Sequence, residues 1–167
     1  MTELSKLSIF KQLLEKGPII LLFVATLNEF DFNYLGLKYF SFNFPFILIY
    51  YWSLKRPGSL GYGLIFLSGL FNDAVVGLPI GVSSLSYLFI CGFSSYLRNI
   101  TLRPSRMNDW FFFGFTILVV NSLIYLIVSL IFNVELNYYS ILVNILFTFL
   151  FYIIFSGIFN YYLKLIF

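Results

Sequence analysis

The chain has 167 residues, of which 60% are hydrophobic, 23% aromatic and only 10% charged, and its mean hydropathy is +0.94. A soluble domain carries roughly 25% charged residues. A soluble domain this short also exposes much of its surface to water, so it could not bury this much apolar surface. The composition therefore excludes a soluble globular domain, a disordered tail and a nucleic-acid-binding protein, and it predicts an integral membrane protein.

Reactive side chains are scarce. The chain has no histidine, which is the commonest metal ligand and the usual general base at neutral pH. Its single cysteine, Cys91, can form neither an internal disulfide nor a CxxC site. We therefore expect no catalytic residues, no cofactor and no metal site.

Apolar segments alternate along the chain with connections that contain proline or charge. A helix needs about 20 mostly apolar residues to cross about 30 Å of hydrocarbon. All five prolines fall near segment boundaries, where a missing backbone N–H does least harm; Pro45 falls in the first turn of the second segment. Asn108 or Asp109 is expected to cap the fifth helix. In one all-helical membrane domain, the six predicted spans are residues 17–35, 39–55, 58–76, 81–101, 109–133 and 138–163.

The basic residues predict how the chain is oriented. With the N-terminus inside, only Lys38 of the ten Lys and Arg residues lies outside, as the positive-inside rule requires, so both termini should be cytoplasmic. Arg98, Arg103 and Arg106 mark a cytoplasmic loop that should bind anionic lipid head groups, or alternatively a cytoplasmic protein. Residues 1–16 are expected to form a short amphipathic helix on the inner membrane surface or, alternatively, a frayed end.

The segment from Gly61 to Gly81 holds the most informative polar residues. Continued as a helix, this segment places on one stripe, at i+4 spacing, Gly61, Ile65, Gly69 and Asp73, with Ser68 and Asn72 beside them. Small residues let a second membrane helix approach closely. The helix should then break at a Gly-Leu-Pro-Ile-Gly turn. The candidate structural or partner-binding residues are Gly61, Ser68, Gly69, Asn72, Asp73, Gly77, Pro79 and Gly81.

Asp73 allows three interpretations. A carboxylate at mid-membrane costs about 2.5–3.5 kcal/mol on insertion scales, so its side chain should face the bundle or the outer boundary. It could be a proton or substrate site of a transporter, a structural acceptor that caps the next helix, or a charge that faces a partner. A solitary acid without a matching buried base argues against ion transport.

The remaining polar residues lie on the later segments. Asn121, Ser122 and Asn144 are expected to be buried and hydrogen-bonded across helices. The outer faces of the last two segments should contact lipid, or alternatively a partner's transmembrane helix. One face of the fourth segment should make close helix contact, or alternatively line a hydroxyl-rich ligand cavity; it holds Ser84, Leu88, Cys91, Gly92 and Ser95.

Three short motifs follow one another in the second to fourth segments. They are PFILIYYWSLKRP at 45–57, GLFND at 69–73 and GLPIG at 77–81. Together with the length, the six spans and the loop charges, they resemble the rod shape-determining protein MreD family over essentially the whole chain. The chain departs from the family in having Asn72 beside Asp73 and in its many Phe and Tyr residues.

This resemblance implies a non-enzymatic scaffold in the bacterial cytoplasmic membrane. Such a scaffold binds the bitopic protein MreC and works with MreB, RodA and a class B penicillin-binding transpeptidase to position lateral peptidoglycan synthesis and maintain cell shape. The family fold is similar to the six-helix substrate-binding subunits of energy-coupling-factor transporters, which makes a vitamin-binding subunit the alternative. The predicted outer loops are short and mostly aromatic, and this favours the scaffold.

Overall fold

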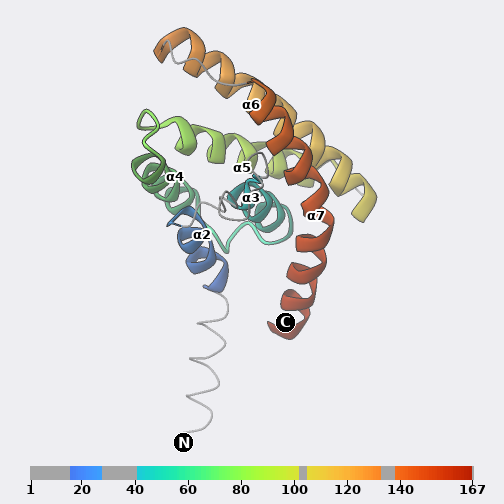
Figure 1. Ribbon diagram of the computed structural model, residues 1–167. Coiled ribbons are helices and arrows are strands. Elements are labelled where there is room, and N and C mark those ends of the chain that lie inside the picture. The colour runs from blue at the N-terminus through green and yellow to red at the C-terminus, as the bar shows by residue number, and fades with distance from the viewer. Residues whose placement is uncertain (1–15, 28–40, 102–104, 133–137, 167) are drawn as a thin grey trace, which may run out of the picture.

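The structure is a computed structural model that describes residues 16–27, 41–101, 105–132 and 138–166. Within these ranges the fold is all-helical, with six helices and no strand (Figure 1). The helices are α2 (Gly17–Leu27), α3 (Phe44–Lys55), α4 (Tyr62–Val76), α5 (Val82–Ile100), α6 (Arg106–Phe132) and α7 (Tyr138–Ile166).

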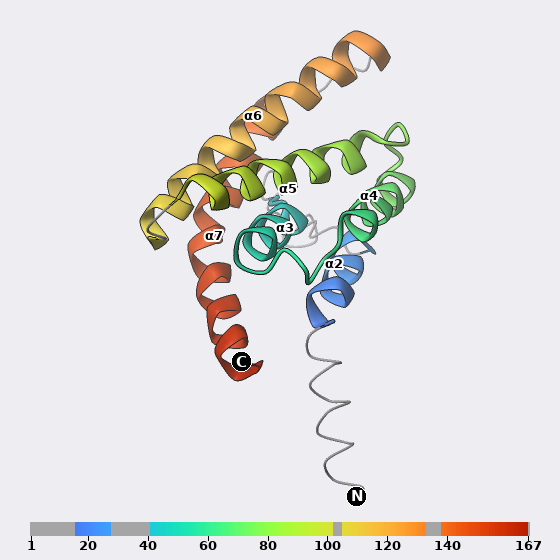
Figure 2. The ribbon, with the colours of Figure 1, turned by 180° about the vertical axis from the view of Figure 1, so that it is seen from behind.

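Helix α3 forms the centre of the fold. Every residue from Phe44 to Leu54 is buried. The helix packs against α2, α5 and α7, and both views show it surrounded by other helices (Figures 1 and 2). A helix that is apolar around its whole circumference either faces lipid or is covered by its neighbours, and here the neighbours cover it. The run IYYWSL therefore belongs to the core.

Local signals explain where α3 begins. The side chain of Asn43 accepts a hydrogen bond from the backbone N–H of Phe46 at 3.2 Å, and Pro45 lies in the first turn, as predicted. The predicted span 39–55 is wrong at its start, because residues 41–43 are not helical.

Other predicted boundaries also need correction. Helix α4 begins at Tyr62 instead of residue 58, because the chain turns over residues 57–60, which start with the Pro-Gly pair. Helix α6 begins at Arg106, before the predicted start at 109. Helix α2 is described as far as Leu27, and the rest of the predicted span 17–35 lies outside the described residues, as does almost all of the segment 1–16.

Helices α6 and α7 are the two described helices that are long and apolar enough to cross a membrane. They have 27 and 29 residues, or about 40 Å each. Only 22% and 11% of their most apolar stretches are buried, whereas the core helix of a soluble protein would be mostly buried. The two helices pack on each other, and in both views the C-terminal half of α6 extends beyond the other helices (Figures 1 and 2).

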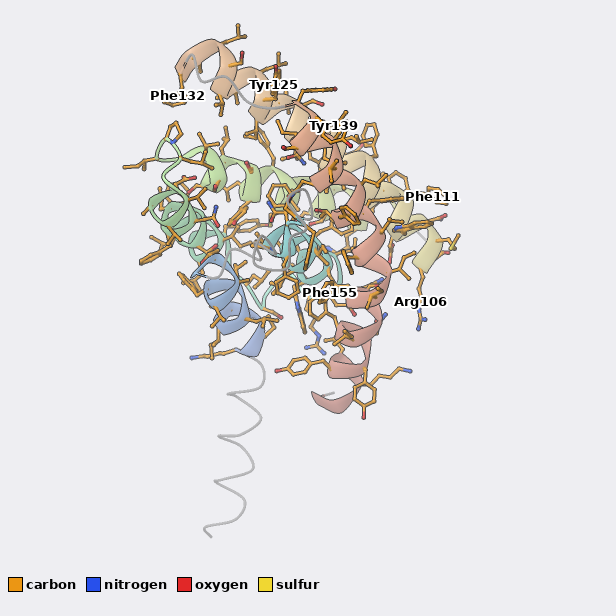
Figure 3. All side chains as sticks on the ribbon, in the orientation of Figure 1. Arg106, Phe111, Tyr125, Phe132, Tyr139 and Phe155 are labelled. Carbon is orange, nitrogen blue, oxygen red and sulfur yellow. The ribbon has the colours of Figure 1, made fainter. Side chains whose placement is uncertain are left out.

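Aromatic rings fill the contact between α3 and α7. The rings of Phe44 and Phe155 are 4.8 Å apart, and Phe155 points from α7 toward α3 (Figure 3). The hydroxyl of Tyr51 donates to the side chain of Asn160 at 2.7 Å. Much of the unusual Phe and Tyr content therefore lies in the protein interior as well as on the surface.

Candidate functional site

The carboxylate of Asp73 joins the end of α4 to the start of α5. Its side chain is completely buried. One oxygen accepts the backbone N–H of Gly81 at 2.7 Å, and the other accepts that of Ser83 at 2.8 Å. The first N–H groups of a helix have no partner within the helix, and a carboxylate there also interacts favourably with the helix dipole. Of the three interpretations of Asp73, this geometry supports the one in which the carboxylate is a structural acceptor that caps the next helix.

Two glycines shape the turn that brings Asp73 to α5. Gly77 ends α4 with φ 75°, and Gly81 precedes α5 with φ 103°. These left-handed conformations strain residues that carry a Cβ. Pro79 lies between them, and its carbonyl oxygen accepts the N–H of Val82 at 3.2 Å. The GLPIG segment therefore forms the predicted turn between the two helices.

Helices α4 and α5 approach each other most closely at Gly69. A Cβ added to Gly69 would collide with the backbone of Ser84, so only glycine fits this crossing. The Ser84 hydroxyl donates to the carbonyl oxygen of Phe66 at 3.0 Å, and the Asn72 amide donates to the Ser83 hydroxyl at 2.9 Å. Ser68 is fully buried on the same face, with its hydroxyl bonded to Ile65 of its own helix.

Gly61 does not belong to this contact. It is exposed at the cap before α4, with φ 68°, and nothing lies within 4 Å of a Cβ built there. The stripe predicted from Gly61 to Asp73 therefore begins one turn later, at Ile65, because the helix itself starts only at Tyr62.

The predicted face of α5 is also only partly correct. Ser84 and Cys91 are buried, but Gly92 is exposed, and nothing lies within 4 Å of a Cβ built on it. The sequence interpretation followed the small residues, whereas the buried face also includes the large Tyr87 and Ile90. The fully buried or nearly buried residues of this helix are Val82, Ser83, Ser84, Ser86, Tyr87, Ile90, Cys91, Ser94 and Leu97.

The two described arginines of the predicted basic loop lie in different environments. The guanidinium of Arg98 donates to the backbone carbonyl oxygen of Ser53 at 2.9 Å and so supports the last turn of α3. Arg106 is exposed at the start of α6 and points away from the helices (Figure 3). Arg103 lies outside the described residues.

An ion pair between α3 and α6 was missed by the sequence analysis. The ammonium of Lys55 lies 2.7 Å from a carboxylate oxygen of Asp109, and the two side chains are 28% and 7% exposed. Helix α6 begins at Arg106, so both predicted caps, Asn108 and Asp109, lie inside its first turn and neither is its N-cap. An acid directly before a long apolar run was the available signal in the sequence, but nothing in the spacing identified Lys55 as its partner.

A cleft of about 250 Å³ opens between α6 and α7. Its lining is mostly Leu and Ile from both helices, together with Asn121, Ser122, Tyr125 and Tyr138. Among the described residues, Asn121 and Ser122 do not make the predicted bonds across helices, because Asn121 donates to Ile117 of its own helix at 2.8 Å and Ser122 is exposed. Asn144 does bond outside its helix, to the Ser41 hydroxyl at 3.0 Å.

The described residues offer packing and hydrogen bonding, but no reactive cluster. Among them, no group of three His, Cys, Asp or Glu side chains lies close enough together to hold a metal ion. Comparison with known proteins gave no match to a protein-family model, a curated protein or a solved structure. The part of the chain that the structure describes is all-helical, with two helices long and apolar enough to cross a membrane.

Proposed function

We propose that the chain is a six-span scaffold of the MreD type in the bacterial cytoplasmic membrane, with both termini inside. In this role it is not an enzyme. It binds the single transmembrane helix of MreC, and through MreC it helps MreB, RodA and a class B transpeptidase to place new peptidoglycan along the side wall.

One observation carries the proposal. The residues of the GLFND and GLPIG motifs act together as one packing unit, in which Asp73 caps α5 and Gly69 lets Ser84 approach. Each of these residues has a defined capping or packing role, and this supports a shared architecture with the MreD family, in which the same motifs occur.

The outward surface supports an organising role. Large apolar side chains are exposed along α6 and α7, including Phe111 at 60% and Leu130 at 75%. Such surfaces face lipid or another transmembrane helix. Because the buried Asp73 has both oxygens bonded to backbone N–H groups, it supports a structural role better than a transport role.

Depletion of the protein in its native bacterium tests the proposal. If the protein serves elongation, depleted rods become round and swell, and tagged protein co-purifies with MreC from detergent extracts. Normal rod shape together with vitamin auxotrophy would contradict the proposal and favour the uptake subunit. Restoration by the wild-type gene on a plasmid is the control.

A further inference from the structure

The cleft between α6 and α7 contains two polar side chains, Asn121 and Ser122, with hydrogen-bonding groups that the described part of the fold does not use. The hydroxyl of Ser122 is exposed and has no hydrogen-bond partner among the described residues. The amide of Asn121 donates to Ile117, but within the described part of the chain its oxygen accepts no hydrogen bond. Leu and Ile side chains surround both residues.

Asn121 and Ser122 lie at a depth in the membrane where a polar group without a hydrogen-bond partner is unfavourable. Helix α6 has 27 residues and is about 40 Å long, and Asn121 lies close to its midpoint. Around this depth the bilayer offers only hydrocarbon chains, and a polar group without a partner there costs free energy. An acyl chain could fill the apolar part of the cleft but could not bond Asn121 or Ser122.

The shape of the cleft limits what can provide the missing bonds. It lies between two crossing helices, so it is concave and fits one convex rod. A two-fold dimer brings the same patch of both copies together, and two concave patches do not fill each other. A separate transmembrane helix fits better than a second copy of this chain.

We propose that the α6–α7 cleft binds one transmembrane helix of a partner protein. A Ser, Thr, Asn or Gln near the middle of that helix hydrogen-bonds to Asn121 and Ser122, and its apolar side chains pack between the Leu and Ile residues. Tyr125 and Tyr138, whose rings meet edge to face at 5.7 Å, line the cleft beside it. This inference depends on the proposed scaffold function and gives the docking surface for its single-span partner.

Site-specific photocrosslinking in cells tests the location. A photoreactive amino acid replaces Leu126 in the cleft or, as the matched control, Leu67 on α4; the two native side chains are 52% and 45% exposed. We expect the single-span partner to crosslink at Leu126 and not at Leu67.

The possible failures are distinguishable. Adducts with the partner only at Leu67 would overturn the cleft and leave the scaffold function intact, whereas a wild-type protein that co-purifies with no single-span partner would overturn the scaffold function. A crosslinked dimer of this chain at Leu126 would show a second copy in the cleft. Phospholipid as the only adduct at Leu126 would show a lipid there. Either result would contradict the inference.

A double variant tests the polar contacts. Asn121→Leu with Ser122→Ala should reduce recovery of the partner roughly 3- to 10-fold, which corresponds to the usual strength of one or two hydrogen bonds between membrane helices. Ser156→Ala, which removes a hydroxyl bonded within α7 to Ile153, is the control and should leave recovery unchanged. Unchanged recovery of the partner with the double variant would overturn the proposed contacts.

Discussion

At the scale of single residues, the chain uses its few charges to fix the ends of helices. Asp73 caps α5, Arg98 binds the last turn of α3, and Lys55 pairs with Asp109 at the start of α6. A charged side chain near the hydrocarbon region is costly unless backbone groups or an opposite charge bind it. Each of these contacts therefore strongly favours the helix packing that provides it.

Asp73→Asn should destabilise the protein. The two carboxylate oxygens accept the N–H groups of Gly81 and Ser83, whereas an amide has one oxygen and an NH₂ group that would face the second N–H. We expect a loss of about 1–2 kcal/mol, the usual cost of a lost helix cap, and a lower Tm in detergent. Asn72→Ala is the control and should cost less, because it removes one neutral hydrogen bond to Ser83. Equal Tm values for Asp73→Asn and wild type would contradict the capping role.

The sequence predicted the residues around Asp73 better than the ion pair. Ser68, Gly69 and Asp73 lie within two turns of one helix, so helical periodicity alone places them on one face. Lys55 and Asp109 are far apart in sequence, and only the folded arrangement brings the end of α3 close to the start of α6. The face of α5 was partly mispredicted because it was drawn through Gly92, which is exposed, whereas the buried side also carries the large Tyr87 and Ile90.

At the scale of elements, the hairpin of α4 and α5 depends on one close approach. Gly69→Ala should destabilise the protein by about 1–3 kcal/mol, because the added Cβ meets the backbone of Ser84, which cannot move without shifting α5. Gly92→Ala on α5 is a matched control, since nothing lies within 4 Å of its Cβ. It should leave stability unchanged or raise it by up to about 1 kcal/mol. Thermal unfolding in detergent would measure both, and a Gly69→Ala protein as stable as Gly92→Ala would disprove the close approach.

A second element-scale prediction concerns the link between α3 and α6. Lys55→Met should destabilise the protein more than Asp109→Asn, because it leaves a carboxylate that is only 7% exposed without its cation, whereas Lys55 is 28% exposed and can reach water. The double variant should be more stable than the sum of the two losses predicts, with a coupling of about 1–3 kcal/mol. Chemical denaturation in mixed micelles would supply these values, and strictly additive losses would show that the pair contributes nothing.

At the scale of the whole molecule, the described residues form six helices, and several of these helices are shorter than the spans that the sequence predicts for them. Helices α3, α4 and α5 have 12, 15 and 19 residues, each below the roughly 20 of a regular span, whereas α6 and α7 exceed it. Hydropathy predicts apolar segments, but α3 is apolar because it is the core. Composition alone does not separate a helix that faces lipid from one that is covered by its neighbours.

The proposed six-span topology, with both termini inside, makes a prediction about accessibility. It places the α4–α5 turn outside the cytoplasmic membrane and the start of α6 inside. Cys91 is only 3% exposed, and in a Cys91→Ala background a single cysteine can be introduced by Ile80→Cys or by Met107→Cys, at positions that are 81% and 57% exposed. A maleimide that cannot cross membranes should label the Ile80→Cys protein in intact spheroplasts and the Met107→Cys protein only after permeabilisation. Because both side chains are exposed in the folded protein, a difference in labelling reports the membrane side and not burial. Labelling of Met107→Cys in intact spheroplasts, or protection of Ile80→Cys, would contradict the proposed orientation.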